Sequence, residues 1–366
     1  MNSDVFRDIS YLVLWMTSDC NLACRYCYAD AGRKKDYMNL ETAKKALSLP
    51  QGAFKLQLAG GEPLLNFKLV EAIDQAVKVM ALKTKIQIQT NGTLIDQDLA
   101  IALKKMGVRL GISLDGPPAI NEKMRGKTGA IIQGVKELGA QDVKVNLNAV
   151  ITDETIKTLP ELVDMAFYLG NVAGIGLDLL RETERVRQNG VRKASCEDLK
   201  KYLRLAYKRS KELERLSEKS IVIREVEDAR RRLKKACVGK DYCYASLGQA
   251  LVVLPDGDMY PCGTLINDQS YYMGNLYMPE TYRVVKLKPK LPERCKECEY
   301  ETICAGSCPA RRIVNGGDRP DSIEDCALRK AAFEIVKEEE EKNAKINRFN
   351  QDIWKTDSSG PFESGN

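Results

Sequence analysis

The sequence predicts an α/β protein in which a mostly parallel sheet is followed by a cysteine-rich, loop-rich segment. Two observations support this prediction. Short apolar runs alternate with helical patterns from residue 11 to about residue 180, and eight of the 12 cysteines fall within residues 237–326. Strict alternation of strands and helices is typical of parallel βα units whose helices lie outside the sheet. The 366 residues are enough for one large domain or two smaller ones.

Six strands are predicted in the first half, over Tyr11–Thr17, Phe54–Leu58, Lys85–Thr90, Val108–Leu114, Val143–Val150 and Gly174–Leu179. Helical patterns lie between them, over about 40–49, 66–82, 96–106, 128–138 and 158–169. Six units fit a doubly wound sheet or an incomplete barrel, and they fall short of the eight units of a closed TIM barrel. In either fold we expect ligands at the carboxyl ends of the strands.

The second half begins with two predicted helices within residues 196–236. The second of these helices ends in a basic run, which is interpreted as a solvated helix end rather than a binding site for an acidic partner; its members are Arg230, Arg231, Arg232, Lys234 and Lys235. A further helix is predicted over about 327–345, and the polar segment 358–366 is expected to be disordered.

Composition excludes several classes of chemistry. The chain has no histidine, so it cannot use a Ser-His-Asp triad, histidine-ligated zinc or haem, or an imidazole base. A net charge of +6 is too small to predict a nucleic-acid partner. Residues 1–10 lack a signal-peptide pattern and no apolar run is long enough for a membrane span, so we expect a cytoplasmic protein without a membrane partner. In a cytoplasmic protein, cysteines are more often metal ligands or redox groups than members of disulfides.

The first cysteine group follows the first predicted strand, at the expected ligand-binding edge. Cys20, Cys24 and Cys27 have the spacing C-x3-C-x2-C. Three thiolates on a short loop can bind three irons of a [4Fe–4S] cluster and leave the fourth iron open to a small chelating ligand, whereas an electron-transfer cluster usually has four cysteines. The alternative is a structural metal site, but zinc would need a fourth ligand and no histidine is present to supply it.

Four segments together resemble the radical S-adenosylmethionine (SAM) enzymes. The triplet has their C-x3-C-x-aromatic-C pattern with Tyr26 as the aromatic residue, and each further segment ends a predicted strand: Gly60-Gly61-Glu62-Pro63, Thr90-Asn91-Gly92 and Ser113-Leu114-Asp115-Gly116-Pro117. The resemblance covers about residues 10–180 and implies a partial (β/α)6 barrel. Paired glycines also let a backbone approach a ligand closely.

The resemblance implies a set of SAM-binding residues. The GGEP segment (Gly60, Gly61, Glu62) would bind the amino group of SAM, and Ser113 and Asp115 would lie near its carboxylate and ribose. Asn91, at the end of the third strand, would also bind the cofactor. Tyr26 would stack beside the adenine, although a buried packing tyrosine is the alternative. Asp115 alone could also be a turn residue.

The second cysteine block resembles the seven-cysteine SPASM pattern. Cys243, Gly257 and Cys262 have the spacing C-x13-G-x4-C, and C-x2-C-x5-C-x3-C and a last cysteine follow. With Cys237 the block has eight thiols, the number needed for two fully ligated [4Fe–4S] clusters. A zinc ribbon is the alternative for any CxxC pair. Similarity to anaerobic sulfatase-maturing enzymes implies one cluster on Cys237, Cys243, Cys262 and Cys308 and another on Cys295, Cys298, Cys304 and Cys326.

Two positions depart from this pattern or lie outside it. In the sulfatase-maturing enzymes an aspartate that acts as a base follows the cysteine matching Cys262, but Gly263 stands here, which puts sulfatase maturation in doubt. Cys196 is left over and is interpreted as an unliganded thiol. Asp178 and Glu182, near the end of the sixth strand, are candidates for the general base, and both could equally be loop carboxylates.

The resemblance implies an enzyme that cleaves SAM reductively to a 5′-deoxyadenosyl radical, which abstracts hydrogen from a peptide or protein side chain to install a cross-link, thioether or oxidation. It implies three [4Fe–4S] clusters and a reductase partner such as flavodoxin or ferredoxin. The alternatives are a radical SAM enzyme acting on a small molecule and a non-catalytic iron–sulfur electron carrier. The expected organisation is a barrel over 1–190, a helical bridge over 191–236, a SPASM domain over 237–330 and a C-terminal helix and tail over 331–366.

Overall fold

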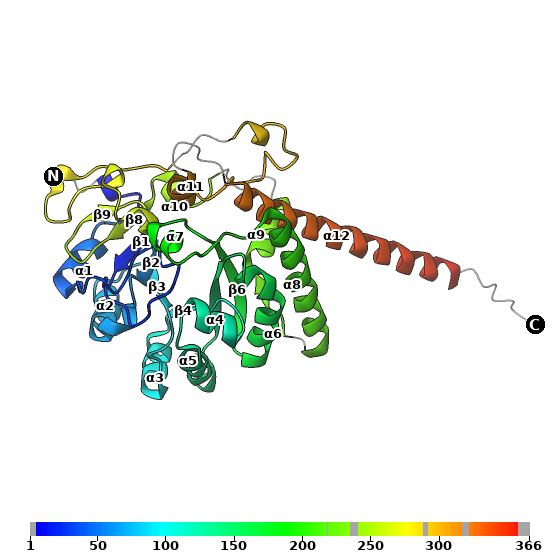
Figure 1. Ribbon diagram of the computed structural model, residues 1–366, viewed down its shortest axis with the longest axis horizontal. Coiled ribbons are helices and arrows are strands. Elements are labelled where there is room, and N and C mark those ends of the chain that lie inside the picture. Colours follow the sequence, from blue (N-terminus) through cyan, green and yellow to red (C-terminus); the bar gives the residue numbers. More distant parts are fainter. Residues whose placement is uncertain (1–4, 218, 235–240, 288–291, 317–321, 358–366) are drawn as a thin grey trace, which may run out of the picture.

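The computed structural model describes residues 5–217, 219–234, 241–287, 292–316 and 322–357, with side chains described as far as residue 345. The described strands form a curved sheet that does not close, in the order β7-β6-β5-β4-β3-β2-β1-β8-β9 (Figure 1). Adjacent strands from β1 to β7 run parallel, as does the pair β1–β8, and β8–β9 is antiparallel. The predicted partial barrel is confirmed.

The six predicted strands are β1 Tyr11–Trp15, β2 Phe54–Ala59, β3 Thr84–Thr90, β4 Arg109–Ser113, β5 Val145–Ile151 and β6 Val172–Leu179. The helices between them are α1 Leu40–Leu47, α2 Phe67–Val79, α3 Gln97–Met106, α5 Thr128–Ala140 and α6 Leu159–Leu169. Four short helices of the described chain were not predicted: α4 Pro118–Met124, α7 Glu184–Gln188, α10 Tyr244–Leu247 and α11 Pro309–Gly316. Their length of one to two turns gives too little periodicity to identify from sequence.

Three further strands extend the sheet beyond the predicted barrel. They are β7 Val222–Ile223, β8 Ala250–Val253 and β9 Met259–Tyr260. Strand β8 pairs with β1, so the cysteine-rich half of the chain continues the same sheet. The sequence did not predict these strands because two of them have only two residues and β8 lies in a segment dominated by turn residues and cysteines.

The strands alternate between apolar and polar residues, which is unusual for parallel strands covered on both faces. In β3, Ile86 and Ile88 are buried against the outer helices, whereas Gln87 and Gln89 point to the inner face. Apolar outer residues of all six barrel strands join the main hydrophobic core with the helices. The alternation therefore arises because one face packs on helices and the other lines a cavity.

Three long helices cover the open side of the barrel. Helix α12 Ile323–Asp357 packs on α8 Cys196–Ser217 and α9 Arg224–Lys234, and its far half projects from the body (Figure 1). No helix in the described part of the chain combines the length and apolar character required to cross a membrane.

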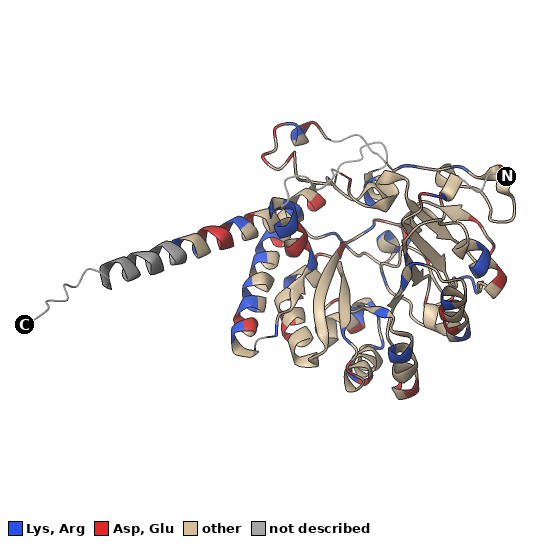
Figure 2. Ribbon diagram, turned by 180° about the vertical axis from the view of Figure 1, so that it is seen from behind, with Lys and Arg blue, Asp and Glu red and all other residues tan. Residues whose placement is uncertain are grey.

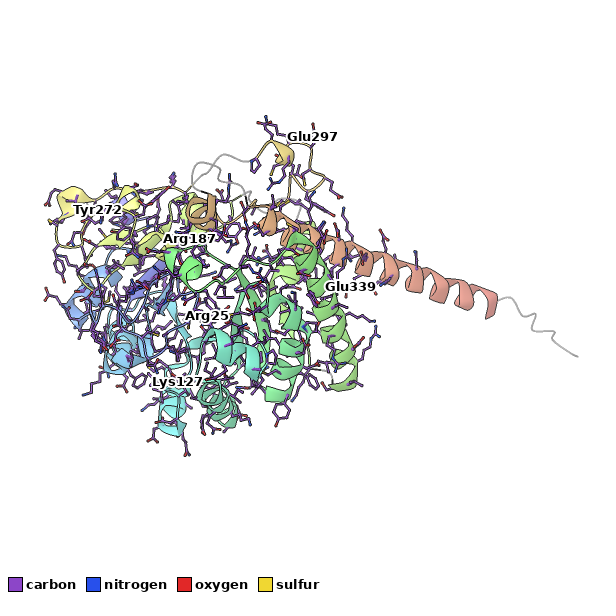
Figure 3. The ribbon with its side chains drawn as sticks, in the orientation of Figure 1. Arg25, Lys127, Arg187, Tyr272, Glu297 and Glu339 are labelled. Atoms are coloured by element: carbon purple, nitrogen blue, oxygen red, sulfur yellow. The ribbon has the colours of Figure 1, made fainter. Side chains whose placement is uncertain are left out.

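The sequence suggested that the basic run at the end of α9 is a solvated helix end. The structure shows that this run is only partly solvated. Arg230 contacts Glu339 at 2.5 Å and donates to the Tyr207 hydroxyl at 2.9 Å, and Arg232 is 6% exposed. Glu339 lies on α12 beside the neighbouring helices (Figure 3). The interpretation failed because the sequence could not show that α12 covers α9. Figure 2, seen from behind, marks the Lys and Arg positions along α8 in blue.

A buried ion pair connects the C-terminal segment to the end of β6. Arg311, on α11 Pro309–Gly316, and Asp325, on α12, are 4% and 3% exposed. The Arg311 Nε atom donates to Asp325 at 3.0 Å and its Nη1 atom donates to the Leu179 carbonyl at 3.2 Å. Because both charges are buried, loss of Asp325 would leave Arg311 with Asp178, at 3.1 Å, as its remaining ionic partner.

We expect Asp325→Ala to lower the free energy of unfolding by about 3 kcal/mol, because Arg311 would remain buried with only the partly exposed Asp178 as an ionic partner. Urea unfolding measured by circular dichroism tests this. The matched control is Glu338→Ala, which removes an exposed partner of Arg204 and should cost less than about 1 kcal/mol. Equal losses in both variants would contradict the account of the Arg311 ion pair.

Candidate active site

A cavity of about 1190 Å³ runs along the inner face of the sheet. Its lining extends from the loop after β1 down to Arg109, the first residue of β4, and includes residues of α9 and α12 on the open side of the barrel. The cavity therefore spans the length of the strands, with the cysteine loop at their carboxyl ends.

The GGEP segment holds the cysteine loop in place through its backbone. The Gly61 N–H donates to the Thr17 carbonyl at 2.8 Å, and the Glu62 N–H donates to the Asp19 carbonyl at 2.9 Å. A Cβ atom at Gly61 would lie 2.0 Å from the Asp19 oxygen, and Gly60 has a φ of +138°. Only glycines permit this approach, so they place the loop directly before Cys20.

The three thiols of the first group, Cys20, Cys24 and Cys27, all border the cavity. The pKa of Cys20 is raised to about 11, mainly by burial and to a smaller extent by Glu62, Cys24 and Cys27. The Arg125 Nη1 atom lies 4.0 Å from the Cys24 sulfur, and the Asn91 Nδ2 atom lies 4.0 Å from the Cys20 sulfur.

Glu62 is fully buried, and its carboxylate is satisfied by groups of the protein. It accepts hydrogen bonds from the Thr90 hydroxyl at 2.6 Å, the Asn91 N–H at 2.7 Å and the Leu64 N–H at 3.0 Å. Burial raises the pKa of Glu62 to about 7, against the lowering effect of these donors. In this arrangement Glu62 joins the ends of β2 and β3 and thereby positions Asn91.

Asp115 is also fully buried, below the cysteine loop. It accepts hydrogen bonds from the Tyr26 hydroxyl, from Arg125 Nη2 at 2.9 Å and from the Val150 N–H at 2.8 Å. Arg125 also lies over the Tyr26 ring, 5.3 Å from its centroid. Asp115 thus fixes a cation beside Cys24, and Tyr26 is a packing residue in a small apolar cluster that also borders the cavity.

The remaining predicted SAM contacts face the cavity. Asn91 lines it and donates to the Asn21 side chain at 2.8 Å, next to Cys20. Ser113 lines it at the end of β4 and accepts from the Gln89 amide at 3.1 Å. Gly60 and Gly61 are part of the same lining.

Cysteines of the second block form one group near the barrel. Burial raises the pKa of Cys308 to about 11, Arg311 and Arg181 oppose this rise, and Cys262 adds to it. The pKa of Cys262 is raised by burial and, in turn, by Cys243. Cys243, Cys262 and Cys308 all pack against one small apolar cluster, and Cys237 lies outside the described residues.

A second group lies further out, around a small cavity of about 50 Å³. Its lining includes Cys295, Cys298, Cys304 and Cys326. Over the described residues, no three His, Cys, Asp or Glu side chains converge closely enough to hold a metal ion. The assignment of these cysteines as ligands stays a prediction. Cys196 lies at the start of α8, and burial raises its pKa.

Comparisons with known proteins identify the family. The chain matches the Radical SAM superfamily over residues 16–166. It is 31% identical over 293 residues to an uncharacterized protein of Methanocaldococcus jannaschii, covering 77% of this chain and 94% of that protein. The chain belongs to the radical SAM superfamily. Membership makes it an enzyme and implies a [4Fe–4S] cluster and SAM.

Other similar proteins differ in what they do. The chain is 26% identical to an AdoMet-dependent heme synthase of Oleidesulfovibrio alaskensis, covering 84% of each chain. It is also 26% identical to a serine-type anaerobic sulfatase-maturating enzyme of Klebsiella aerogenes, covering 82% and 79%. The solved structure of anSMEcpe with bound AdoMet has a TM-score of 0.74 at 23% identity, covering 89% of this chain and 96% of that one, and shows the same fold.

The two candidate bases of this radical SAM enzyme differ in position. Asp178 lines the cavity and pairs with Arg181 at 2.7 Å and with Arg311 at 3.1 Å. Burial would raise the pKa of Asp178, but the two arginines outweigh it and lower the pKa below its ordinary value of 3.8. The Glu182 carboxylate instead lies 3.7 Å from Lys193, away from the described lining.

Sequence reasoning missed Arg181, Tyr28 and Thr264 at the junction of barrel and cysteine block. Arg181 donates to the Thr264 hydroxyl at 2.8 Å and lies over Tyr28, 4.6 Å from its ring centroid. A Cβ atom at Gly263 would lie 2.9 Å from the Trp15 ring, so a side chain there would meet Trp15. Arg181 could have been found from its position, because it follows the candidate base Asp178 by three residues at the end of β6.

We expect Asp178→Asn to lower the rate of 5′-deoxyadenosine formation about tenfold or more, because Arg181 and Arg311 would lose their shared anchor. The pH dependence of that rate between about pH 5 and about pH 9 should not change. A carboxyl group whose pKa lies below its ordinary value stays ionised throughout this range. Loss of an ionisation from the variant's profile would instead identify Asp178 as the base.

Proposed function

We propose that this radical SAM enzyme modifies a side chain of a peptide or protein, forming a cross-link, a thioether or an oxidised residue. The observation that carries this proposal is the amide-rich inner wall of the cavity. Its amides are Gln57, Gln87, Gln89, Asn146 and Asn148. Carboxamides both donate and accept hydrogen bonds, so they match the alternating N–H and C=O groups of an extended peptide.

Two side-chain amides of this wall make no hydrogen bond to another described residue. Gln89 donates to Ser113 and accepts from Asn148, and Gln57 accepts from the Tyr11 hydroxyl. No hydrogen bond to another described residue occupies the side chains of Gln87 and Asn146, which lie toward the starts of their strands. These two amides are available to a peptide in the lower half of the cavity.

Similar proteins support a peptide substrate. One solved structure with this fold, SuiB of Streptococcus suis bound to precursor peptide SuiA, has a TM-score of 0.65 and covers 89% of this chain and 77% of that one. A tetrapyrrole is the second candidate, because similarity to the heme synthase extends over 84% of both chains. The polar strand wall favours the peptide, since a flat apolar macrocycle binds best between apolar walls.

The donor set around the cavity fits the group that the family implies. Cys20, Cys24 and Cys27 would hold the SAM-binding cluster, because they are three neighbouring thiols on one loop. Gly60, Gly61, Asn91 and Ser113 would contact SAM, since they face the same space. When bound, cluster and SAM together supply a carbon radical that abstracts hydrogen from the substrate.

Glu62 and Asp115 would act behind this surface rather than on SAM. Glu62 holds the Asn91 backbone through its N–H, and Asp115 holds Arg125 next to Cys24. The Arg125 guanidinium keeps a buried positive charge near the thiolates, and this charge favours their ionised, ligating form. Tyr26 would fix that guanidinium by its ring and hydroxyl, whether or not the ring also meets the adenine.

We also propose that the chain holds two auxiliary clusters in a separate domain. Residues 237–330 would form a SPASM domain, supported by the separate grouping of Cys243, Cys262 and Cys308 and of the outer four cysteines. Cys237 would complete the inner set. A cytoplasmic reductase such as flavodoxin or ferredoxin would supply electrons to the clusters. The barrel over 1–190, the bridge over 191–236 and the C-terminal part over 331–366 would complete the organisation.

Incubation of the reconstituted enzyme with SAM, a reductant and the peptide encoded beside its gene tests the proposal by mass spectrometry. We expect a mass change in the peptide, because a peptide held along the amide wall would lie in the same cavity as the cysteines that would hold the cluster. Gln87→Leu should raise the KM for the peptide and leave SAM cleavage without peptide unchanged. An unchanged peptide mass while 5′-deoxyadenosine accumulates would overturn the assignment of this peptide as substrate.

A further inference from the structure

We propose that the mouth of the cavity at the starts of the strands binds an acidic segment of the peptide substrate. This inference rests on the proposed function and adds to it the charge and position of a second contact. The contact is a basic rim of three side chains, Lys55, Lys85 and Arg109, which are all exposed. It lies at the end of the cavity away from the cysteine loop.

Strand register places the rim on one edge of the barrel. Lys55 of β2 pairs in register with Lys85 of β3, and the next inner row runs from Gln57 to Gln87 and on to Arg109 of β4. Lys55 and Lys85 each precede a cavity-lining glutamine by two residues, so they share its face of the sheet. The rim therefore continues the amide wall outward into solvent.

The rim cations are not neutralised by the protein. Within the described chain, no carboxylate forms an ion pair with Lys55, Lys85 or Arg109. Lys55 makes a cation–π contact instead, with its Nζ atom 5.2 Å from the centroid of the Tyr244 ring. Other basic residues of the cavity do have partners; Arg224, for example, pairs with Glu225 at 2.9 Å. Unpaired cations next to a binding cavity attract carboxylates and orient an incoming ligand.

Arginines outnumber carboxylates among the described residues that line the cavity. The described lining residues include eight arginines and five carboxylates. The arginines are Arg109, Arg125, Arg181, Arg224, Arg231, Arg232, Arg311 and Arg329, and the carboxylates are Asp178, Glu225, Glu227, Asp228 and Asp325. Arg109, the one of these arginines that belongs to the rim, has no carboxylate partner among the described residues, so the mouth favours an acidic peptide segment over a basic one.

The geometry also gives a spacing. Strand β3 runs from Lys85 at the rim to Thr90, just before Asn91 near the cysteine loop. An extended peptide rises about 3.3 Å per residue, as a strand does, so a peptide lying along β3 would span this distance with about five or six residues. We therefore expect acidic residues about five or six positions from the residue that is modified.

Fluorescence anisotropy with the reconstituted full-length enzyme tests this inference without SAM or reductant. The probes are fluorescein-labelled decapeptides of glycine and serine with three glutamates or, for comparison, three lysines. We expect the glutamate peptide to bind about tenfold more tightly than the lysine peptide, and its affinity to fall as salt rises from about 50 mM to about 500 mM. Equal binding of the two peptides would overturn the proposal.

Variants locate the contact. Lys85→Glu combined with Arg109→Glu should weaken glutamate-peptide binding about tenfold, and the milder Lys85→Gln with Arg109→Gln should weaken it severalfold with less risk to folding. The matched control is Lys105→Glu, an exposed lysine of α3 on the outer side of the barrel, which should change binding less than about twofold. Equal effects of the rim and control variants would overturn the proposal.

Competitors identify the kind of anion. Oligothymidylate or coproporphyrin III that displaces the glutamate peptide at equal concentration would show a non-selective anion surface or a tetrapyrrole site, and either result overturns the proposal. Failure here is distinguishable from failure of the proposed function. If the rim variants modify the peptide encoded beside the gene with unchanged KM, the function stands and the rim contact is wrong.

Discussion

The close approach of Gly61 to the loop after β1 determines where every other functional group lies. Two backbone hydrogen bonds, from Gly61 to Thr17 and from Glu62 to Asp19, join the end of β2 to the residues just before Cys20. No larger residue fits at Gly61, because a Cβ atom would lie 2.0 Å from a carbonyl oxygen. The position of the cysteine loop is therefore set by backbone packing, independently of any ligand.

Three carboxylates connect the cysteine loop and the strand ends to other parts of the protein, as far as the C-terminal segment. Glu62 connects β2 to β3, Asp115 holds Arg125 beside Cys24, and Asp178 is shared by Arg181 and Arg311. Each carboxylate has protein donors as partners, so its charge is compensated where it is buried. The cations thus stand next to thiols of both cysteine groups, where they favour the thiolate form.

The sequence predicted the barrel and the placement of its motifs well, because both depend on local patterns. Strong periodicity identified six strands, and glycine pairs and cysteine spacings marked their carboxyl ends. Strands β7 and β9 have two residues each and carry no such signal. The roles of Glu62 and Asp115 depend on contacts 28 and 89 residues away in the chain, which no local pattern shows. The same limit hid the pairing of Arg230 with α12.

The iron content and electron paramagnetic resonance (EPR) response of the anaerobically reconstituted protein test the central claim, a SAM-binding cluster on the loop after β1. We expect about 12 irons per chain, about four fewer in Cys20→Ala/Cys24→Ala/Cys27→Ala, and no loss in the control Cys196→Ala. Addition of SAM should change the EPR signal of the reduced wild type and not that of the triple variant. A SAM-dependent signal that survives in the triple variant would contradict the account.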